Sequence, residues 1–259
     1  MAARLSTGAR NLLTQAMGFG AIFNRGTIRI YSGSQPANGD AAVTGTHLGT
    51  ISVASGAVTK ETRATGSIEL TGGSSGSVNT VTVGGLNIIP DGAVAFNTSL
   101  NQTASDLCDA INRNGIMMAS VSGAVVTLKG RYGTGVTTAA VSATLTTITA
   151  SYVNMGSGVA GVAPVNGLIL ASPSAGVIAK PSNQIWSMAG IATGTAGWFR
   201  FYTSDADDSG ALVSGAPYFP RLDGTVGVSG ADLNLSSISI VPLMPVTVDS
   251  FSWTQPANA

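Results

Sequence analysis

The chain has 259 residues, and its twelve basic and twelve acidic side chains give a formal net charge of zero. Charged residues make up 9% of the sequence, against roughly 25% in typical soluble domains. So few charges predict an exterior that is covered by neighbouring subunits or coated with Ser, Thr and Gly. No Lys/Arg cluster marks a nucleic-acid or lipid surface, and no apolar run approaches the ~18 residues of a bilayer span. We therefore expect a soluble polypeptide made in the cytoplasm, with no nucleic-acid partner and no membrane association.

The first predicted element is an amphipathic helix over residues 6–17. Its sequence begins with a capping residue, Ser6 or Thr7, and places apolar residues three and four apart on one face. The residues expected to dock this segment on a partner are Arg4, Arg10, Leu12 and Leu13. The alternative, a helix that covers its own domain, fits the same pattern equally well.

Short strands with turn-rich connections follow on both sides of a central segment. The predicted strands lie at 28–31, 48–53, 185–191, 198–202, 233–235 and 246–253. In the strongest of them, Phe199 and Phe201 point to one face and the residues between and beside them to the other. Many short strands separated by turns predict a mainly β protein with a β-sandwich or jelly-roll-like outer domain.

Three charged residues stand in or between the C-terminal strands. We expect Arg200 and Arg221 to pair with Asp223, either across neighbouring strands or across an interface with another protein. An isolated pair at a surface contributes only about 0–1 kcal/mol. The three residues are therefore candidates for an interface rather than a source of stability.

The central segment, residues 66–161, has a different residue pattern and is predicted to form an inserted α+β module of β-β-α-β-β order. Its helix, "TASDLCDAINRNG" at 103–115, is predicted to begin at an N-cap, Thr103, and to end at a left-handed residue, Gly115. A small sheet leaves one apolar face to be covered, and a single helix can cover it. Residues 1–65 and 162–259 then form the outer β-domain that the insertion interrupts.

Residues able to carry out catalysis are few. The sequence has one histidine, His47, and one cysteine, Cys108, and offers no cluster of polar side chains with mutually tuned ionisation. His47 is expected at the start of a strand, and Cys108 is expected inside the helix as a small buried thiol. We therefore expect no catalytic residues, no enzymatic activity and no cofactor.

The acidic stretch "DADDSG" at 205–210 partly matches a calcium-binding loop. Asp205, Asp207 and Ser209 occupy its first, third and fifth positions, but Ala216 stands where the bidentate Glu belongs. An acidic turn between two strands is the favoured interpretation, and a calcium site is the weaker one.

Two groups of segments resemble known families. "GTIRIYSGSQPANGDAAVTGTHLGTI", "ATGTAGWFRFYTSD", "RLDGTVGVSGADLNLSSISI" and "VTVDSFSWTQP" resemble virion structural proteins of tailed bacteriophages. "VNTVTVGGLNI", "TASDLCDAINRNG" and "MASVSGAVVTLKG" resemble the IN-type module of flagellar hook-associated proteins, which also recurs in phage structural proteins. The resemblance implies a virion component, made in the host bacterial cytoplasm, that assembles as a homo-oligomer and with the major capsid protein or other virion proteins.

Three functions remain open at this point. The first is a capsid decoration or cement protein that packs on the head lattice and on itself. The second is a structural protein of the tail, the collar or the head-tail junction. The third is a carbohydrate-binding receptor module that would use the acidic turn and exposed tryptophans. Trp186, Trp198 and Trp253 stand in alternating strands, however, where tryptophans more often fill a core.

Overall fold

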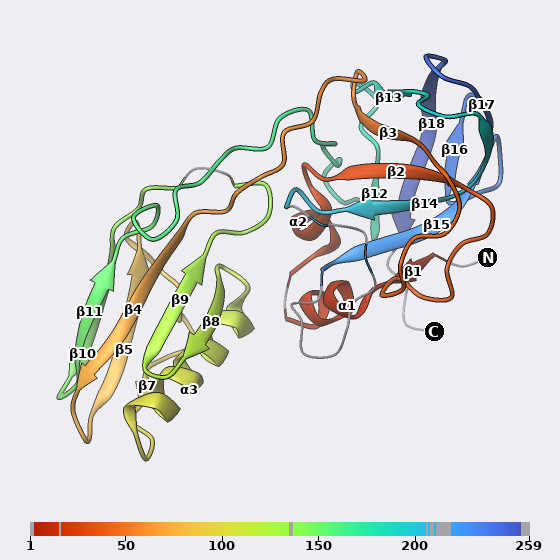
Figure 1. Ribbon diagram of the computed structural model, residues 1–259. Coiled ribbons are helices and arrows are strands. Elements are labelled where there is room, and N and C mark those ends of the chain that lie inside the picture. The colour runs from red at the N-terminus through yellow and green to blue at the C-terminus, as the bar shows by residue number, and fades with distance from the viewer. Residues whose placement is uncertain are drawn as a thin grey trace. The chain divides into compact units, whose positions relative to one another are not determined.

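The computed structural model describes residues 3–15, 17–134, 137–205, 207, 210 and 219–254 of the chain. The protein is mainly β, as the sequence predicts, with 43% strand and 12% helix. It forms two compact units (Figure 1). The barrel unit comprises Met1–Thr14, Gly18–Lys60 and Pro164–Ala259, and the inserted module comprises Gln15–Met17 and Glu61–Ala163. The structure thus places the two boundaries between the units at 60/61 and 163/164, where the sequence pattern predicts them at 65/66 and 161/162.

Seven strands of the barrel unit close into a barrel (Figure 1). They are β2 (Thr27–Ser32), β3 (His47–Val53), β13 (Trp186–Ala189), β14 (Gly194–Tyr202), β15 (Arg221–Gly227), β16 (Leu233–Leu235) and β18 (Pro245–Thr254). The order around the ring is β2, β3, β13, β18, β16, β15, β14, and β14 pairs again with β2. Neighbours are antiparallel except β15 and β16, which are parallel. Closure pairs the edges that an open sheet exposes, and a β-sandwich or jelly-roll-like form is not confirmed.

Large apolar side chains fill the barrel. Ile28 and Ile30 of β2 lie in register with Phe201 and Phe199 of β14, and all four are fully buried. The ring of Phe251 meets Phe199 and Phe201 nearly edge-on, at centroid separations of 6.2 and 5.7 Å. Burial of apolar area contributes about 25 cal/mol per Å². The alternation that points these residues inward also turns the residues between them, arginines included, to the outer face.

The N-terminal segment lies against the barrel unit's own strand β15. Strand β1 (Arg4–Leu5) pairs antiparallel with Leu222 and Asp223, and helix α1 (Thr7–Thr14) follows it. Ser6 caps α1, because its Oγ accepts the N–H of Ala9 at 3.2 Å. The helix expected over 6–17 is thus shorter, and a second helix, α2 (Phe19–Phe23), begins after the extended residue Gly18. Two short strands complete the unit: β12 (Val177–Ala179) pairs with β18, and β17 (Ser239–Ile240) pairs with β14.

The inserted module contains two four-stranded sheets and one long helix. Its strands are β4 (Thr65–Gly72), β5 (Ser77–Val83), β6 (Leu86–Asn87), β7 (Val94–Ala95), β8 (Met118–Ser122), β9 (Val125–Lys129), β10 (Val141–Thr146) and β11 (Thr149–Val153). One sheet has the order β11-β4-β9-β8, and the other has the order β10-β5-β6 with β7 also paired to β5. Ile68, Val81, Leu107, Ile111 and Val126 belong to one core shared by both sheets and the helix.

The helix of the module, α3 (Leu100–Asn114), begins earlier than the sequence pattern suggests. Its N-cap is Ser99, whose Oγ accepts the N–H of Gln102, so the prediction of Thr103 as the cap was wrong. Thr103 is buried inside the helix, where its Oγ1 accepts the N–H of Asn97 and donates to the carbonyl of Ser99. The predicted stop is confirmed, because Gly115 has the left-handed φ of 59°.

Candidate functional site

The outer face of strand β14 is buried as deeply as its inner face. Trp198, Arg200 and Tyr202 point away from the barrel interior, as alternation predicts, yet none is more than 1% exposed. The ring of Tyr31 stacks on Trp198 at 4.6 Å, and its hydroxyl lies 3.1 Å from that of Tyr202. The guanidinium of Arg200 reaches the loop between β2 and β3, where Nη1 donates to the carbonyl of Ala41 at 2.9 Å. A second layer of chain therefore covers this part of the barrel.

Two ion pairs lie under this cover. Nε and Nη2 of Arg200 donate to the two carboxylate oxygens of Asp223 at 2.6 and 2.7 Å, and both side chains are fully buried. Nε and Nη2 of Arg221 donate to Asp207 at 2.7 Å each, and Nη1 donates to the carbonyl of Gly210 at 2.8 Å. Arg200 thus pairs with Asp223 across neighbouring strands, one of the expected arrangements, but the expectation that Arg221 pairs with Asp223 was wrong, because its partner is Asp207. All three interface candidates are fully buried in the chain and present no surface to a neighbour.

Burial and pairing act in opposite directions on the pKa values of the Arg200–Asp223 pair. Burial alone lowers the pKa of Arg200, but the hydrogen bonds and charge of Asp223 outweigh it and raise that pKa above its ordinary value. Burial raises the pKa of Asp223, and the hydrogen bonds and charge of Arg200 offset part of that rise. The guanidinium therefore stays charged, and the ionised form of the carboxylate is favoured first by Arg200 and further by the charges of Arg221 and Arg4.

The acidic turn serves this network. Both carboxylate oxygens of Asp207 accept from Arg221, so a guanidinium occupies the position that a cation would take. Burial lowers the pKa of Lys60, and the charge of Asp205 offsets a part of that lowering. Ser209 lies outside the described residues. Among the residues that the structure describes, no group of three His, Cys, Asp or Glu side chains could hold a metal ion.

The four N-terminal candidates lie on the barrel unit's own N-terminal segment. Arg4 pairs in register with Asp223, and its Nη1 donates to the carbonyl of Pro36. Arg10 is exposed and donates to Thr7 Oγ1 at 2.9 Å. Leu12 is buried and Leu13 half-buried. The segment covers its own domain, which is one of the two arrangements that the sequence left open.

The tryptophans and the histidine are also parts of the packed barrel unit. Trp186 and Trp198 are fully buried, and Trp253 stacks on Phe19 with ring centroids 4.9 Å apart. Neither of the two buried rings can face a sugar. His47 is half-buried, with Nε2 3.2 Å from the hydroxyl of Thr50, and burial together with the charge of Arg29 lowers its pKa.

A pocket of about 440 Å³, which we call the barrel pocket, opens on the outer face of β2, β3 and β13. Arg29, Thr50, Ser52, Lys60 and Ile191 are among the residues that line it. Lys60 donates two hydrogen bonds to neutral oxygens of the barrel unit, the hydroxyl of Thr27 and the carbonyl of Thr203. Burial, followed by repulsion from Arg29, lowers the pKa of Lys60 to about 8. This pocket places two basic groups side by side.

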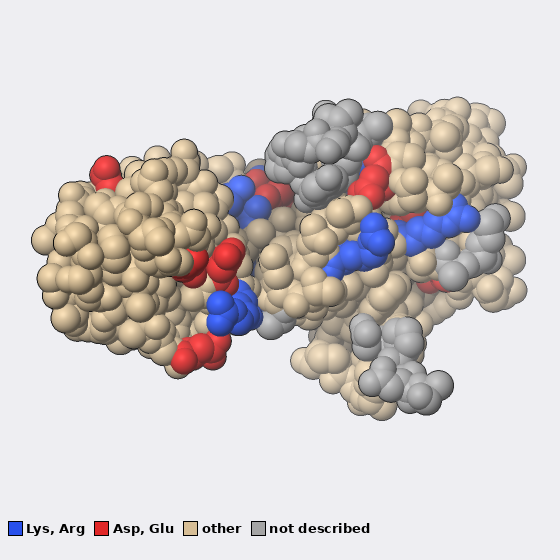
Figure 2. Space-filling model, turned by 90° about the horizontal axis from the view of Figure 1, so that it is seen from below, with Lys and Arg blue, Asp and Glu red and all other residues tan. Residues whose placement is uncertain are grey.

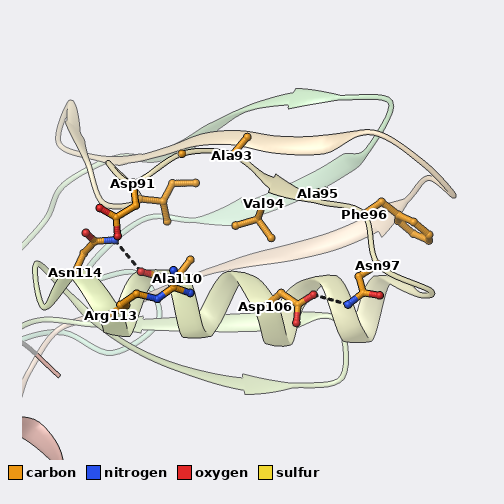
Figure 3. Close-up of a pocket in the computed structure, with 12 residues that line it drawn as sticks. Asp91, Ala93, Val94, Ala95, Phe96, Asn97, Asp106, Ala110, Arg113 and Asn114 are labelled. Atoms are coloured by element: carbon orange, nitrogen blue, oxygen red, sulfur yellow. Dashed lines mark hydrogen bonds between the residues drawn. The ribbon is translucent and has the colours of Figure 1, made fainter. Parts of the chain in front are cut away.

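A second cleft of about 440 Å³, the module cleft, runs between α3 and the segment that carries β7 (Figure 3). At one end, Asp106 accepts hydrogen bonds from Asn97 at 2.8 Å and from Gln102 at 3.0 Å, and these bonds lower its pKa. Arg113 lies towards the other end of the cleft (Figure 3).

Cys108 of α3 is buried, as expected, and burial raises the pKa of its thiol.

Sequence reasoning missed Lys60, which only the folded chain brings to Arg29. One signal was present: "KETR" at 60–63 holds three charged residues in four positions of a chain that is 9% charged. The alternation of Ile28, Arg29 and Ile30 also places the arginine on the outer face. Nothing in the pattern indicated that both residues would line one pocket, because they belong to different segments.

Comparison with known proteins identifies no relative. No protein-family model, no curated protein and no solved structure matches the chain. Within the described part of the chain, every helix is too short or too polar to cross a membrane. The barrel with its outer charge network and pocket, and the module with its cleft, are therefore interpreted from their own residues.

Proposed function

We propose that the chain is a structural protein of a tailed-bacteriophage virion, a capsid decoration or cement protein that packs on the head lattice and on copies of itself. Its partners in this proposal are other copies of the chain and the major capsid protein, and its role is not enzymatic. The resemblance of the outer segments to phage virion proteins, and of the central segment to the IN-type module, supports this assignment.

The observation that carries the proposal is the composition of the surface. Charged side chains occupy small separate areas of the face shown in Figure 2, and most of that face is formed by other residues. Among the described residues, these large apolar side chains are at least one-third exposed: Leu86, Val121, Tyr152, Val153, Val159, Val162, Val165, Ile169, Ile185, Ile191, Val228, Val241 and Leu243. Single exposed apolar residues are normal, but here few charges solvate the surface around them. Such a surface suits a protein covered by neighbours.

Uncharged hydroxyl pairs on the sheets of the module support the same conclusion. Thr82 Oγ1 lies 2.7 Å from Ser142 Oγ across β5 and β10, and Thr71 Oγ1 lies 3.1 Å from Thr149 Oγ1 across β4 and β11. Thr71, Ser142 and Thr149 are exposed, and Thr82 is half-buried. Short hydroxyl side chains give a flat polar face that can pack closely without desolvating a charge. A protein that works by fitting surfaces together benefits from such faces.

The experiment that tests the proposal is a count of copies per virion. We would purify particles of the phage that encodes the chain and quantify the chain by mass spectrometry relative to the major capsid protein. A head decoration protein should be present in on the order of hundreds of copies, because a shell repeats its lattice sites. Absence of the chain from purified particles would refute a virion role.

The same count decides between the head and the tail. About six or twelve copies would match the ring symmetry of a tail, collar or head-tail junction and would move the protein there. The carbohydrate-binding alternative has less support from the residues themselves, because two of its three tryptophans are fully buried.

A further inference from the structure

The barrel pocket has a chemistry that a packing role does not require. Its wall includes Lys60, whose Nζ donates to Thr27 Oγ1 at 3.0 Å and to the carbonyl of Thr203 at 3.2 Å. Both acceptors are neutral, and an ammonium group has a third proton to donate. A lysine largely withdrawn from water, with only neutral hydrogen-bond acceptors, is costly unless an anion joins it.

Arg29 stands on the same wall and repels Lys60. Its guanidinium lies 4.8 Å from the ring centroid of Tyr202, and its charge is the second cause, after burial, that lowers the pKa of Lys60. The described residues that line the pocket include no Asp and no Glu. An oxyanion placed against Lys60 would accept its third proton and would offset the repulsion from Arg29.

The remaining lining narrows the class of ligand. Thr50, Ser52 and Ser55 bring hydroxyl groups to the pocket, and Val58 and Ile191 bring apolar surface. Hydroxyls of this kind donate and accept hydrogen bonds, and a volume of about 440 Å³ lies within the range that small-molecule ligands occupy. The lining therefore suits a small molecule that combines an oxyanion with hydroxyl groups and some apolar surface.

We propose that the barrel pocket binds a small oxyanion, a carboxylate or a phosphate carried on a hydroxylated carbon skeleton, between Lys60 and Arg29. Acidic sugars and sugar phosphates share this chemistry. The site lies within the barrel unit and does not depend on a place in the virion. A particle protein with this pocket would carry a ligand-binding activity in addition to its packing role.

Binding should depend on pH through Lys60. The groups that face it are Arg29 from β2, Tyr202 from β14, with its ring centroid 5.8 Å from Nζ, and Asp205 and Asp207 beyond β14. The charges of the two aspartates raise the pKa of Lys60, but burial and Arg29 prevail and set it at about 8. A bound anion favours the charged ammonium and raises that pKa. Binding at about pH 8 therefore takes up protons, and affinity falls as Lys60 loses its charge.

Calorimetric titration of the full chain at low ionic strength tests the proposal, with glucuronate, glucose 1-phosphate and glucose as probes. We expect at least one of the two anions to bind and glucose not to bind. Whichever anion binds tells whether the site prefers a carboxylate or a phosphate. Lys60→Gln and Arg29→Gln should each weaken binding at least about tenfold, whereas Arg10→Gln, which removes an exposed arginine that does not line the pocket, should leave it unchanged.

Two further measurements are independent of whether the glutamine variants fold. Titration of the unmodified chain at about pH 8, in buffers of different ionisation enthalpy, should show proton uptake on binding. Lys60→Arg should retain binding at about pH 7 and lose the decline in affinity towards about pH 9, because arginine stays charged. Failure of both anions to bind at millimolar concentration, binding that survives both glutamine substitutions, or binding without proton uptake would overturn the proposal.

Discussion

Removal of the Asp223 carboxylate should destabilise the barrel unit severely. In Asp223→Ala, Arg200 loses both of its charge-assisted hydrogen bonds, at 2.6 and 2.7 Å, and keeps its bond to the carbonyl of Ala41. The guanidinium remains fully buried, and the high pKa of arginine prevents it from losing its proton. The variant must therefore either hold an unpaired charge in the interior or open the layer that covers it.

Because both partners have zero exposure, the magnitude follows from buried rather than surface pairs. Removing one partner of a buried ion pair costs about 3–5 kcal/mol, whereas a surface pair contributes about 0–1 kcal/mol. The double variant Arg200→Met with Asp223→Leu removes both charges and should recover most of the loss, because apolar replacements of buried pairs are often neutral. Asp249→Ala is the matched control, because that carboxylate is exposed on β18.

Urea unfolding followed by tryptophan fluorescence measures the effect in the barrel unit alone, because all three tryptophans of the chain lie there. With a denaturant slope of about 2 kcal/mol per M, a loss of about 4 kcal/mol lowers the midpoint by about 2 M. A loss below about 1 kcal/mol in Asp223→Ala would refute the buried-pair reasoning. A double variant as unstable as the single one would show that packing, not charge, sets the cost.

Three further predictions concern other residues. Asn112→Ala removes two hydrogen bonds between the side chain and the backbone of Ala119, at 2.8 and 3.0 Å, and should lower the free energy of unfolding by about 1–3 kcal/mol. Hydrogen exchange at the Ala119 amide should then accelerate. Asn114→Ala is the control, because it removes a single hydrogen bond, to the carbonyl of Ala110. Between about pH 8 and 10.5, Lys60 is protonated in the unfolded chain but has lost its proton in the folded chain. The free energy of unfolding of the unmodified chain should therefore rise with pH over this range, and it should rise more steeply than that of Lys60→Met, which has no such group. Equal slopes in the two proteins would contradict the lowered pKa. Cys108 should react with a thiol reagent much more slowly in the folded chain than in urea, because its thiol is buried and its pKa is raised.

Local pattern predicted those features that neighbouring residues determine. The helix at α3 and its stop at Gly115 follow from apolar spacing and a left-handed glycine, and both are present in the structure. The start was misplaced because Thr103 and Ser99 are both good caps by residue type. The choice between them depends on Asn97, whose N–H holds the Thr103 hydroxyl inside the helix.

Long-range pairing decided what the pattern could not show. The alternation in β14 predicts two faces, and it favours an exposed position for Arg200 because charged residues are rarely buried. The loop that contains Ala41, far away in sequence, contributes to the second layer that buries this face. Closure of the barrel also depends on distant pairings, β14 with β2 and β13 with β3, for which short segments carry no signal.

The inserted module should fold without the barrel unit. Its buried apolar cluster, which runs from Ala64 to Met155, consists of residues of the module alone. The chain also enters and leaves the module at neighbouring points, because Thr62 and Val162 exchange two backbone hydrogen bonds of 3.1 and 2.7 Å. Excision at 61 and 163 therefore keeps every residue of this cluster and separates no distant ends, and it leaves Gln15–Met17 with the barrel unit.

The experiment uses two chains, residues 61–163 alone and a barrel unit in which Asn-Gly replaces them. Thr59 and Val165 form the last bridge before the module, so a tight turn between Lys60 and Pro164 can close the gap. We expect dispersed amide signals and cooperative unfolding from the module, with about 5–15 kcal/mol of stability, and tryptophan fluorescence unchanged in the barrel unit. A module that is unfolded by itself, while the shortened barrel unit still folds, would show that its core needs support from outside residues 61–163. Folding of both pieces would instead mean that the insertion adds a separate body to a barrel that is complete without it.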